Sequence, residues 1–172
     1  RLPVDGRMRV APGVWAVGDV TGKGAFTHVA AYQARLCVAD ILGRPRPDAD
    51  YRALPRVTFT DPEIGSVGLT EEQARRDGGD VVVLQGSVAE SARGWLHGAE
   101  GFVKLVARDG VVVGATAMCP YGGEVFSMLA LAVHAELTLE TLRTMIFAYP
   151  TFHRAVDSAL WPPNSAAKIA GA

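Results

Sequence analysis

The sequence predicts an α+β fold in which helices pack against an antiparallel sheet. Three apolar runs of strand length predict strands at 81–85, 102–107 and 111–118. Arg108-Asp109-Gly110 has the composition of a hairpin turn between the last two of them. The final third instead carries apolar residues at helical spacing, first over 123–136. Strands lying between helices in this way are typical of an α+β domain rather than of a nucleotide-binding βαβ fold.

The first 45 residues predict a strand, an acidic turn and a helix. Val14–Val17 suits a strand buried on both faces, and Gly18-Asp19 ends it at a sharp turn. Thr27 is placed to cap the helix, and Gly43 and Pro45 end it. Along one side, this helix carries Ala30, Ala34, Cys37, Val38 and Ile41. A ligand would lie where the strand meets the helix, because a carboxylate accepts bonds from sugar hydroxyls and a helix N-terminus favours an anion or carbonyl.

The chain changes character at 43–50, a short stretch rich in proline and charge. Such a composition suits an exposed connection, so we expect two domains, 1–46 and 47–172. The two cysteines, Cys37 and Cys119, are far apart and have no histidine nearby. Their spacing predicts buried free thiols rather than a redox pair or a zinc site, and we expect no metal site.

The second domain is predicted to open with a hairpin and a capped helix. Residues 57–69 predict two short strands around Asp61-Pro62. Thr70 and Gln73 have the spacing of a capping box, and Gly78-Gly79 ends the helix that follows. Side chains of opposite charge four residues apart stabilise a helix on its exposed side, and the pairs here are Glu71 with Arg75 and Glu72 with Arg76.

Three helices are predicted in the final third. The first has an apolar stripe at i, i+3, i+4, i+7 and i+8, formed by Val125, Met128, Leu129, Ala132 and Val133. Thr138 is expected to cap the second, which contains Leu139, Leu142 and Ile146. Thr151 is expected to cap the third, which Pro162-Pro163 ends. Its inward residues are predicted to be Phe152, Val156, Ala159 and Leu160.

Charge and hydropathy exclude several classes of partner. The 172 residues include 17 basic and 18 acidic side chains, for a net charge of −1, and the basic residues form no long run. We therefore expect neither a nucleic acid nor a membrane surface as partner. No apolar stretch approaches the roughly twenty residues that span a bilayer, and the N-terminus lacks the plan of a signal peptide. A cytoplasmic protein is the expectation.

The run Val14–Val20, followed by Thr27–Ala31, resembles the second FAD motif of the pyridine nucleotide-disulfide oxidoreductases. The resemblance implies that Asp19, after the turn at Gly18, bonds a ribityl hydroxyl of FAD. It also implies that the backbone N–H of Thr27 faces the flavin pyrimidine carbonyl. His28 is a further candidate for cofactor binding, and its alternative is an ordinary residue in the first turn of a helix.

The remainder of the chain resembles the C-terminal dimerisation domain of the same family. Phe59–Glu71 is similar to the opening of that domain, and Gly122–Val125 to the start of an interface helix. This implies a homodimer through helices at 123–136 and 151–161, whose last segment reaches the partner's active site. It also implies a longer parent flavoprotein that uses FAD and NAD(P) and serves cell redox homeostasis.

We expect the chain by itself to be an inactive C-terminal fragment that binds no cofactor. It contains no glycine-rich nucleotide motif after a strand and no paired redox cysteines, so domains for FAD and NAD(P) would have to precede it. A start at Arg1 without methionine favours this interpretation. The alternative is a stand-alone, non-catalytic dimerisation or scaffold module, which predicts a natural start near Arg1.

The sharpest departure from the family lies at Tyr149–Arg154. Members that turn over thiols and disulfides carry His-Pro-Thr-x-x-Glu, in which histidine exchanges a proton and glutamate orients it. Here Tyr149 and Arg154 stand at those two positions. A phenol with an ordinary pKa of about 10 is a poor base at neutral pH, and arginine accepts no proton. We therefore do not expect ordinary disulfide turnover by a histidine from the partner.

Tyr149, His153 and Arg154 are nevertheless the catalytic candidates. Tyrosine at this position is similar to mercuric reductase and the soluble transhydrogenase, but Lys168–Ala172 lacks the cysteine pair of the mercuric enzyme. His153 is interpreted either as a displaced acid or base or as an exposed residue of a first helical turn. Arg154 breaks the capping preference and is either functional or merely solvent-facing. The Tyr149-Pro150 bond is a candidate cis peptide, as in the family.

Overall fold

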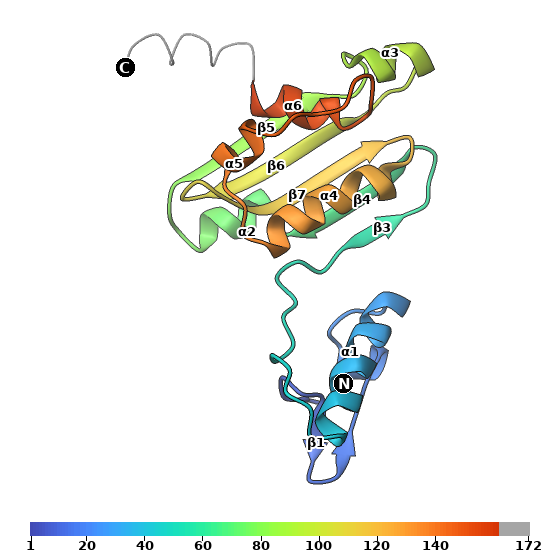
Figure 1. Cartoon of the computed structure of the whole chain (residues 1–172), viewed down its shortest axis with the longest axis vertical. Helices are drawn as coiled ribbons and strands as arrows, with labels where there is room; N and C mark the ends of the chain where they lie inside the picture. Colours follow the sequence, from blue (N-terminus) through green and yellow to red (C-terminus); the bar gives the residue numbers. More distant parts are fainter. Residues whose placement is uncertain (162–172) are drawn as a thin grey trace. The chain divides into compact units, whose positions relative to one another are not determined.

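The computed structural model describes residues 1–161, so the predicted helix end at Pro162-Pro163 and the segment Lys168–Ala172 lie outside the described residues. The chain divides into two compact units, Arg1–Tyr51 and a second that begins at Arg52 (Figure 1). Within residues 1–161, no helix combines the length and the apolar character needed to cross a membrane.

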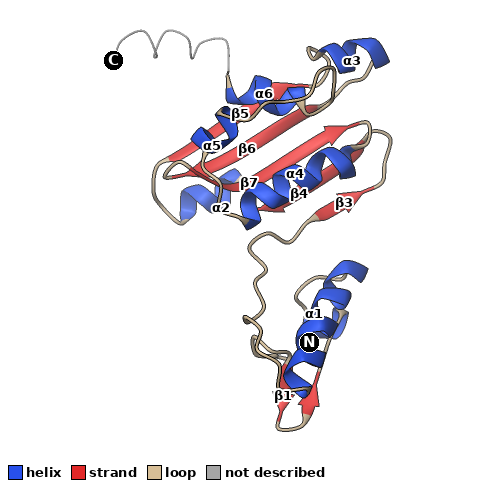
Figure 2. Cartoon of the chain, viewed as in Figure 1, coloured by secondary structure: helices blue, strands red, loops and turns tan. Residues whose placement is uncertain are grey.

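The first unit contains a small antiparallel sheet and one long helix (Figure 2). Strand β1 (Arg9–Ala11) pairs with β2 (Val14–Trp15), and a 3-10 turn, η1 (Asp19–Thr21), follows Gly18. The prediction that Val14–Val17 is a strand buried on both faces is wrong, since Val14 and Val17 are both exposed. A sheet of two strands cannot enclose either strand on both faces.

Helix α1 (Thr27–Ile41) begins at Thr27, one residue earlier than it would if Thr27 were the N-cap. Phe26, in extended conformation, precedes the helix without a side-chain capping bond, so the prediction that Thr27 is the N-cap is wrong. The predicted end is confirmed, because Gly43 adopts a φ of 62° and the Arg44 N–H donates to the Ala39 carbonyl at 2.8 Å. This is a Schellman ending, which needs a left-handed residue after the helix.

The buried side of α1 differs from the apolar side that the sequence displays. Its fully enclosed residues are Val29, Gln33, Leu36 and Ala39. Val38 is 52% exposed and Ile41 is exposed as well, so the apolar side noted in the sequence is not the side that this unit buries. The reason is that α1 turns Gln33 toward the loops of its own unit, where the amide finds hydrogen-bond partners. A count of apolar residues alone cannot foresee a buried amide.

The second unit is built on a five-stranded antiparallel sheet of order β3-β4-β7-β6-β5. Its strands are β3 (Arg56–Thr58), β4 (Glu63–Gly68), β5 (Val81–Ser87), β6 (Phe102–Arg108) and β7 (Val111–Cys119). Between β6 and β7, Asp109 and Gly110 have φ values of 51° and 80°. Two positive φ angles are characteristic of a type I′ hairpin. The antiparallel sheet with its helices confirms the predicted α+β fold.

Five helices accompany this sheet in the described part of the unit. They are α2 (Glu71–Arg76), α3 (Ala92–His97), α4 (Gly122–His134), α5 (Leu139–Arg143) and α6 (Arg154–Leu160). Helix α4 packs on β4 and β7, while α6 packs on β5 and β6 and contacts α5. Figure 2 shows α4, α5 and α6 over one face of the sheet. The core between these layers includes Val103, Leu105, Val112, Phe126, Leu129 and Val156.

The caps of these helices test the sequence predictions one by one. The capping box of α2 is confirmed, with both the Thr70 and the Gln73 bonds present, and Thr138 caps α5 through the Thr141 N–H at 3.0 Å. The prediction that Thr151 is a cap is wrong, because its hydroxyl donates to the Ala148 carbonyl at 2.8 Å instead. The prediction that this helix contains Ile146 is also wrong, because α5 ends at Arg143, and the Ile146 side chain beyond it is 98% exposed.

The ion pairs predicted on α2 and the inward side of α6 are confirmed. Glu71 and Glu72 bond Arg75 and Arg76. The four residues predicted to point inward from the last helix, Phe152, Val156, Ala159 and Leu160, are all buried. Helix α3 was not predicted. Its N-cap is Ser91, whose hydroxyl accepts the Gly94 N–H at 3.0 Å.

One buried carboxylate joins the hairpin of the first unit to α1. The guanidinium of Arg9 donates to Asp40 through Nη2 at 2.6 Å, and the indole N–H of Trp15 donates at 2.9 Å. The Asp40 side chain is only 3% exposed. The bonds from Arg9 and then Trp15 lower the pKa of Asp40 from 3.8 to about 2.

This lowered pKa predicts how acid acts on the first unit. A carboxylate whose pKa is lower in the folded than in the unfolded chain stabilises the fold above its unfolded pKa, and loses this effect as the pH falls through the folded value. Asp40→Asn is therefore expected to lower the melting temperature at pH 7, with the difference from wild type shrinking as the pH falls toward about 2. The fluorescence of Trp15 would report the melting of the first unit, in a background in which Trp95 and Trp161 are replaced by Phe. Asp48→Asn at an exposed ion pair is the control, with little expected effect. A difference independent of pH would contradict the assignment.

Candidate functional site

The residues predicted to bind a cofactor lie on one connection, from the end of β2 to the start of α1. Gly18 is buried and adopts a φ of 82°, a value that glycine reaches without strain. Asp19 begins η1 with its side chain exposed, while Thr27 and His28 form the first turn of α1. His28 stacks on Phe26, with ring centroids 5.1 Å apart.

The electrostatics of this connection suit an electron-rich group. Helix α1 has no acidic residue in its first turn. The first backbone bonds of the helix run from the Val29 and Ala30 N–H groups to the Phe26 carbonyl, at 3.0 and 3.1 Å, and the positive end of the helix dipole lies at this turn. The connection presents an exposed carboxylate, Asp19, and a helix N-terminus at Thr27.

A buried amide beneath the turn was missed by sequence reasoning. The Oε1 of Gln33 accepts the Gly18 N–H at 2.6 Å, and its Nε2 donates to the Thr21 hydroxyl at 3.0 Å and to the Tyr51 hydroxyl at 2.9 Å. The signal was present in the spacing, because Val29, Gln33 and Leu36 fall at i, i+4 and i+7 and therefore share one side of the helix.

The catalytic candidates lie on the segment that leads into α6. The Tyr149-Pro150 bond is cis, as the sequence led us to expect. Tyr149 is 72% exposed, and the guanidinium of Arg154 lies 6.0 Å from its ring centroid. Arg154 also pairs with Asp157 at 2.9 Å. A positive charge alone is unfavourable at a helix start. Here the carboxylate of Asp157, one turn along, pairs with Arg154 and offsets this.

His153 stands directly before α6, half-buried. Burial lowers the pKa of this imidazole below its ordinary value of 6.5. The ring is therefore mainly neutral at pH 7 and has one nitrogen able to accept a proton. At neutral pH neither the phenol of Tyr149 nor the guanidinium of Arg154 offers such an acceptor.

Phe152 anchors this segment in the second unit. Its buried ring lies 5.5 Å from His97 and 6.4 Å from Tyr121 between centroids, and the guanidinium of Arg93 lies 6.0 Å from it. Arg93 and His97 belong to α3, the helix that the sequence did not predict. Rings and a cation at these distances attract one another. They help to hold the backbone between Tyr149 and Arg154.

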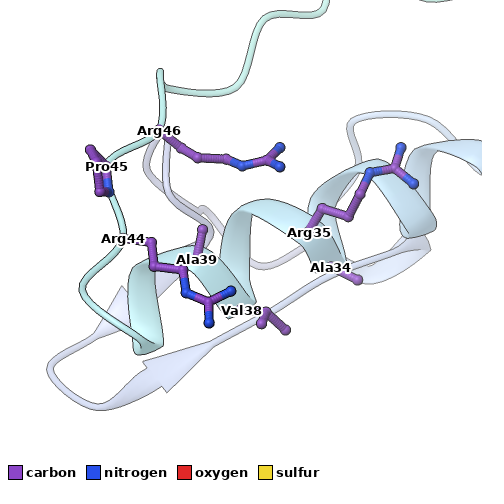
Figure 3. A pocket seen from close by; sticks show the side chains of 7 residues that line it. All are labelled: Ala34, Arg35, Val38, Ala39, Arg44, Pro45 and Arg46. Carbon is purple, nitrogen blue, oxygen red and sulfur yellow. The ribbon is translucent and has the colours of Figure 1, made fainter.

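A separate hollow lies along the C-terminal half of α1 (Figure 3). Its volume is about 450 Å³, and it is lined by Ala34, Arg35, Val38, Ala39, Arg44, Pro45 and Arg46. None of the predicted site residues is among them. Two of them, Ala34 and Val38, come from the apolar side of α1 noted in the sequence.

The described residues contain no group of three or more His, Cys, Asp or Glu side chains arranged for a metal ion. Both cysteines are free thiols, and Cys119 is buried while Cys37 is half-buried. Burial raises the pKa of Cys119 to about 11, so the thiol is protonated and unreactive at neutral pH.

Known proteins match most of this chain. Residues 54–160 match the family described as "Pyridine nucleotide-disulphide oxidoreductase, dimerisation domain". Dihydrolipoyl dehydrogenase from Geobacillus stearothermophilus is 37% identical over 154 residues, which are 87% of this chain and 33% of the relative. The dihydrolipoyl dehydrogenase of Halobacterium salinarum is 36% identical over 92% of this chain and 34% of the relative.

Solved structures agree with these matches. LpdA from Mycobacterium tuberculosis superposes with a TM-score of 0.85 at 29% identity, over 92% of this chain and 36% of the other. The HOCl-induced flavoprotein disulfide reductase RclA from Escherichia coli gives 0.82 at 29% identity, over 92% and 38%. The chain thus spans about a third of the length of the relatives it matches.

The environment of His153 predicts its titration. We expect the midpoint of its ring signals in a proton NMR titration to lie below 6.5, the ordinary value, because burial disfavours the charged ring. The unfolded chain then binds more protons between the two pKa values, so the fold becomes less stable as the pH falls below 6.5. His153→Gln assigns the signals and should reduce that dependence. A midpoint at or above 6.5 would show that the imidazole is not held in a buried environment.

Proposed function

The chain belongs to the pyridine nucleotide-disulphide oxidoreductase family, with its dimerisation domain at 54–160, and from this premise we propose that it pairs two subunits of an FAD- and NAD(P)-dependent oxidoreductase. One observation carries the proposal. In a single chain, the region that matches the dimerisation domain comes after a strand, an acidic turn and the start of a helix. The dimerisation domain would hold the subunits together, and the preceding unit would complete an FAD site supplied mainly by residues upstream.

The residues at the start of α1 fit a flavin. Asp19 is exposed and would accept a hydrogen bond from a ribityl hydroxyl, while the N–H of Thr27 would donate to the pyrimidine carbonyl. Gly18 lets the backbone turn sharply at this point, and His28 borders the same turn. When bound, FAD would supply the electron-transfer chemistry of the parent enzyme. We propose that the chain alone neither retains FAD nor turns over substrate, since most cofactor contacts would come from the upstream part.

The exposed stripe of α1 supports the same proposal. Ala34, Val38 and Ile41 have the helical spacing of a buried side, yet Val38 and Ile41 are exposed and Ala34 is only half-buried. We propose that the upstream part of an FAD-binding domain covers this side. The sequence pattern and the structure would then both be explained, since the pattern would report burial in the longer protein.

The helical layer of the second unit is the proposed dimer interface, formed by the helices at 123–136 and 151–161. Leu131 of α4 and Ile146, just beyond α5, are large apolar side chains that the single chain leaves exposed. A two-fold interface would bury the same patch on both subunits. Residues of the Tyr149–Arg154 segment would then reach the flavin of the partner subunit.

The segment restricts the chemistry that it could perform there. The base and its orienting carboxylate are replaced by Tyr149 and Arg154, whose side chains contact each other. His153, neutral at pH 7, is the group of the three that could accept a proton. We propose that the substrate of the parent enzyme is not an ordinary disulfide that exchanges protons with a histidine at position 149.

The dimer proposal predicts the effect of one exposed residue. Ile146→Glu should weaken self-association of the chain about tenfold or more, because it would bury an unpaired charge at the interface. Sedimentation equilibrium measures this, and circular dichroism confirms that the exposed position leaves the fold intact. Val38→Glu, an exposed valine on α1, is the matched control and should leave self-association unchanged. A chain that remains monomeric at tens of micromolar would show that this assembly is not self-sufficient.

In the parent protein, the FAD proposal predicts that Val38→Glu affects FAD content more than Ile146→Glu does, the reverse of their order for self-association. The reading frame upstream of Arg1 should encode glycine-rich nucleotide motifs, and the protein expressed from it should retain FAD. In that protein, Val38→Glu should lower the FAD content because it places a charge in the covered side of α1. Ile146→Glu should reduce FAD content less. A natural start near Arg1 with no such motifs would leave a stand-alone dimerisation module.

A further inference from the structure

We propose that Gln33 is the positioning residue of the cofactor-facing turn, holding Gly18 to Thr21 so that Asp19 is presented to FAD. This inference rests on the FAD site proposed above. It concerns a residue that lies beneath the turn and is itself fully buried, so Gln33 touches no bound molecule. Its role would be to set the geometry of the groups that do.

The hydrogen bonds around Gln33 form a closed set. Its Oε1 accepts the Gly18 N–H at 2.6 Å and its Nε2 donates to the Thr21 hydroxyl at 3.0 Å. That hydroxyl in turn donates to the Gly18 carbonyl at 2.7 Å. Both backbone polar groups of Gly18 and the side chain of Thr21 are therefore fixed. Asp19 lies between these two residues in the chain, so its backbone has little freedom left.

Only a carboxamide meets all these demands at once. The site needs one acceptor for the Gly18 N–H and two donors for the hydroxyls of Thr21 and Tyr51. An amide supplies an acceptor oxygen and two N–H donors in one side chain. An apolar residue of similar size would leave the Gly18 N–H buried without a partner, which is unfavourable.

Tyr51 extends the support beyond α1. Its hydroxyl accepts from Gln33 at 2.9 Å and donates to the sulfur of Met8 at 3.8 Å. The Lys23 ammonium, on the loop that follows η1, lies 5.8 Å from the centre of the Tyr51 ring. Tyr51 is the last residue of the first unit. The cofactor-facing turn is thus tied through Gln33 to the residue where the first unit ends.

The first arm of the test uses the chain alone and needs no cofactor. Amide exchange of Gly18, followed by NMR, should become about tenfold faster or more in Gln33→Leu, because its N–H loses a buried partner. Gln33→Glu keeps an acceptor for the Gly18 N–H but loses both donors, so its increase should be smaller than that of Gln33→Leu but clearly measurable. Tyr51→Phe, which removes one outer bond only, should give a smaller increase and covers the case in which Gln33→Leu does not fold.

A control separates positioning from general loss of stability. Leu36→Val creates a small cavity on the same side of α1 but removes no hydrogen bond to the turn. It should leave Gly18 protection relative to its α1 neighbours unchanged. If Gln33→Leu and Leu36→Val speed Gly18 exchange equally, or if neither variant of Gln33 alters it, the positioning role is overturned.

The second arm uses the FAD-containing parent protein. There Gln33→Leu should lower FAD retention and shift the midpoint potential of the flavin, Gln33→Glu should have a smaller effect on both because it keeps the acceptor for Gly18, and Leu36→Val should change neither. Normal flavin properties in Gln33→Leu would overturn the proposal. A wild-type parent that binds no FAD would instead overturn the proposed function, and Gly18 exchange would still report whether Gln33 holds the turn.

Discussion

The second unit depends on the place of β7 at the centre of the antiparallel sheet, with β4 on one side and β6 on the other. From this strand the chain passes directly into α4, which packs back on β4 and β7. Helix α6 covers the apolar face of the same sheet above β5 and β6. Because burial of that face stabilises the unit, the entry to α6 and the Tyr149–Arg154 segment are held against a rigid support.

The first unit depends on polar bonds to a degree that its small size explains. A hairpin, a turn and one helix bury little apolar surface, so directional contacts have a larger share in fixing its shape. The carboxylate of Asp40 joins the hairpin to α1, and the amide of Gln33 joins α1 to the cofactor-facing turn. The exposed apolar side of the same helix is then available to a further layer, such as the upstream part of the domain that we propose.

The two proposed site regions differ in what they offer. The turn near Asp19 presents a carboxylate and a helix N-terminus, which suit a neutral or electron-rich cofactor edge. The segment near Tyr149 presents a phenol ring, a guanidinium paired with Asp157 and a neutral imidazole. The chain belongs to one oxidoreductase family, and we propose that both regions serve the same parent enzyme. If the segment lies beside the flavin as we propose, the departures at Tyr149 and Arg154 would change how protons are handled there.

The sequence by itself determined the fold class, the strands β5, β6 and β7, the capping box at Thr70 and the helical spacing of α4. Each of these depends on local periodicity or on a cap within a few residues, which a sequence displays directly. The tertiary structure alone decided that Gln33 is buried, that Ile146 is exposed, and that Phe152 rests against α3. These outcomes depend on partners distant in the chain, such as Tyr51 for Gln33 and His97 for Phe152. The spacing of Val29, Gln33 and Leu36 marks a shared side of the helix, but it does not identify these partners.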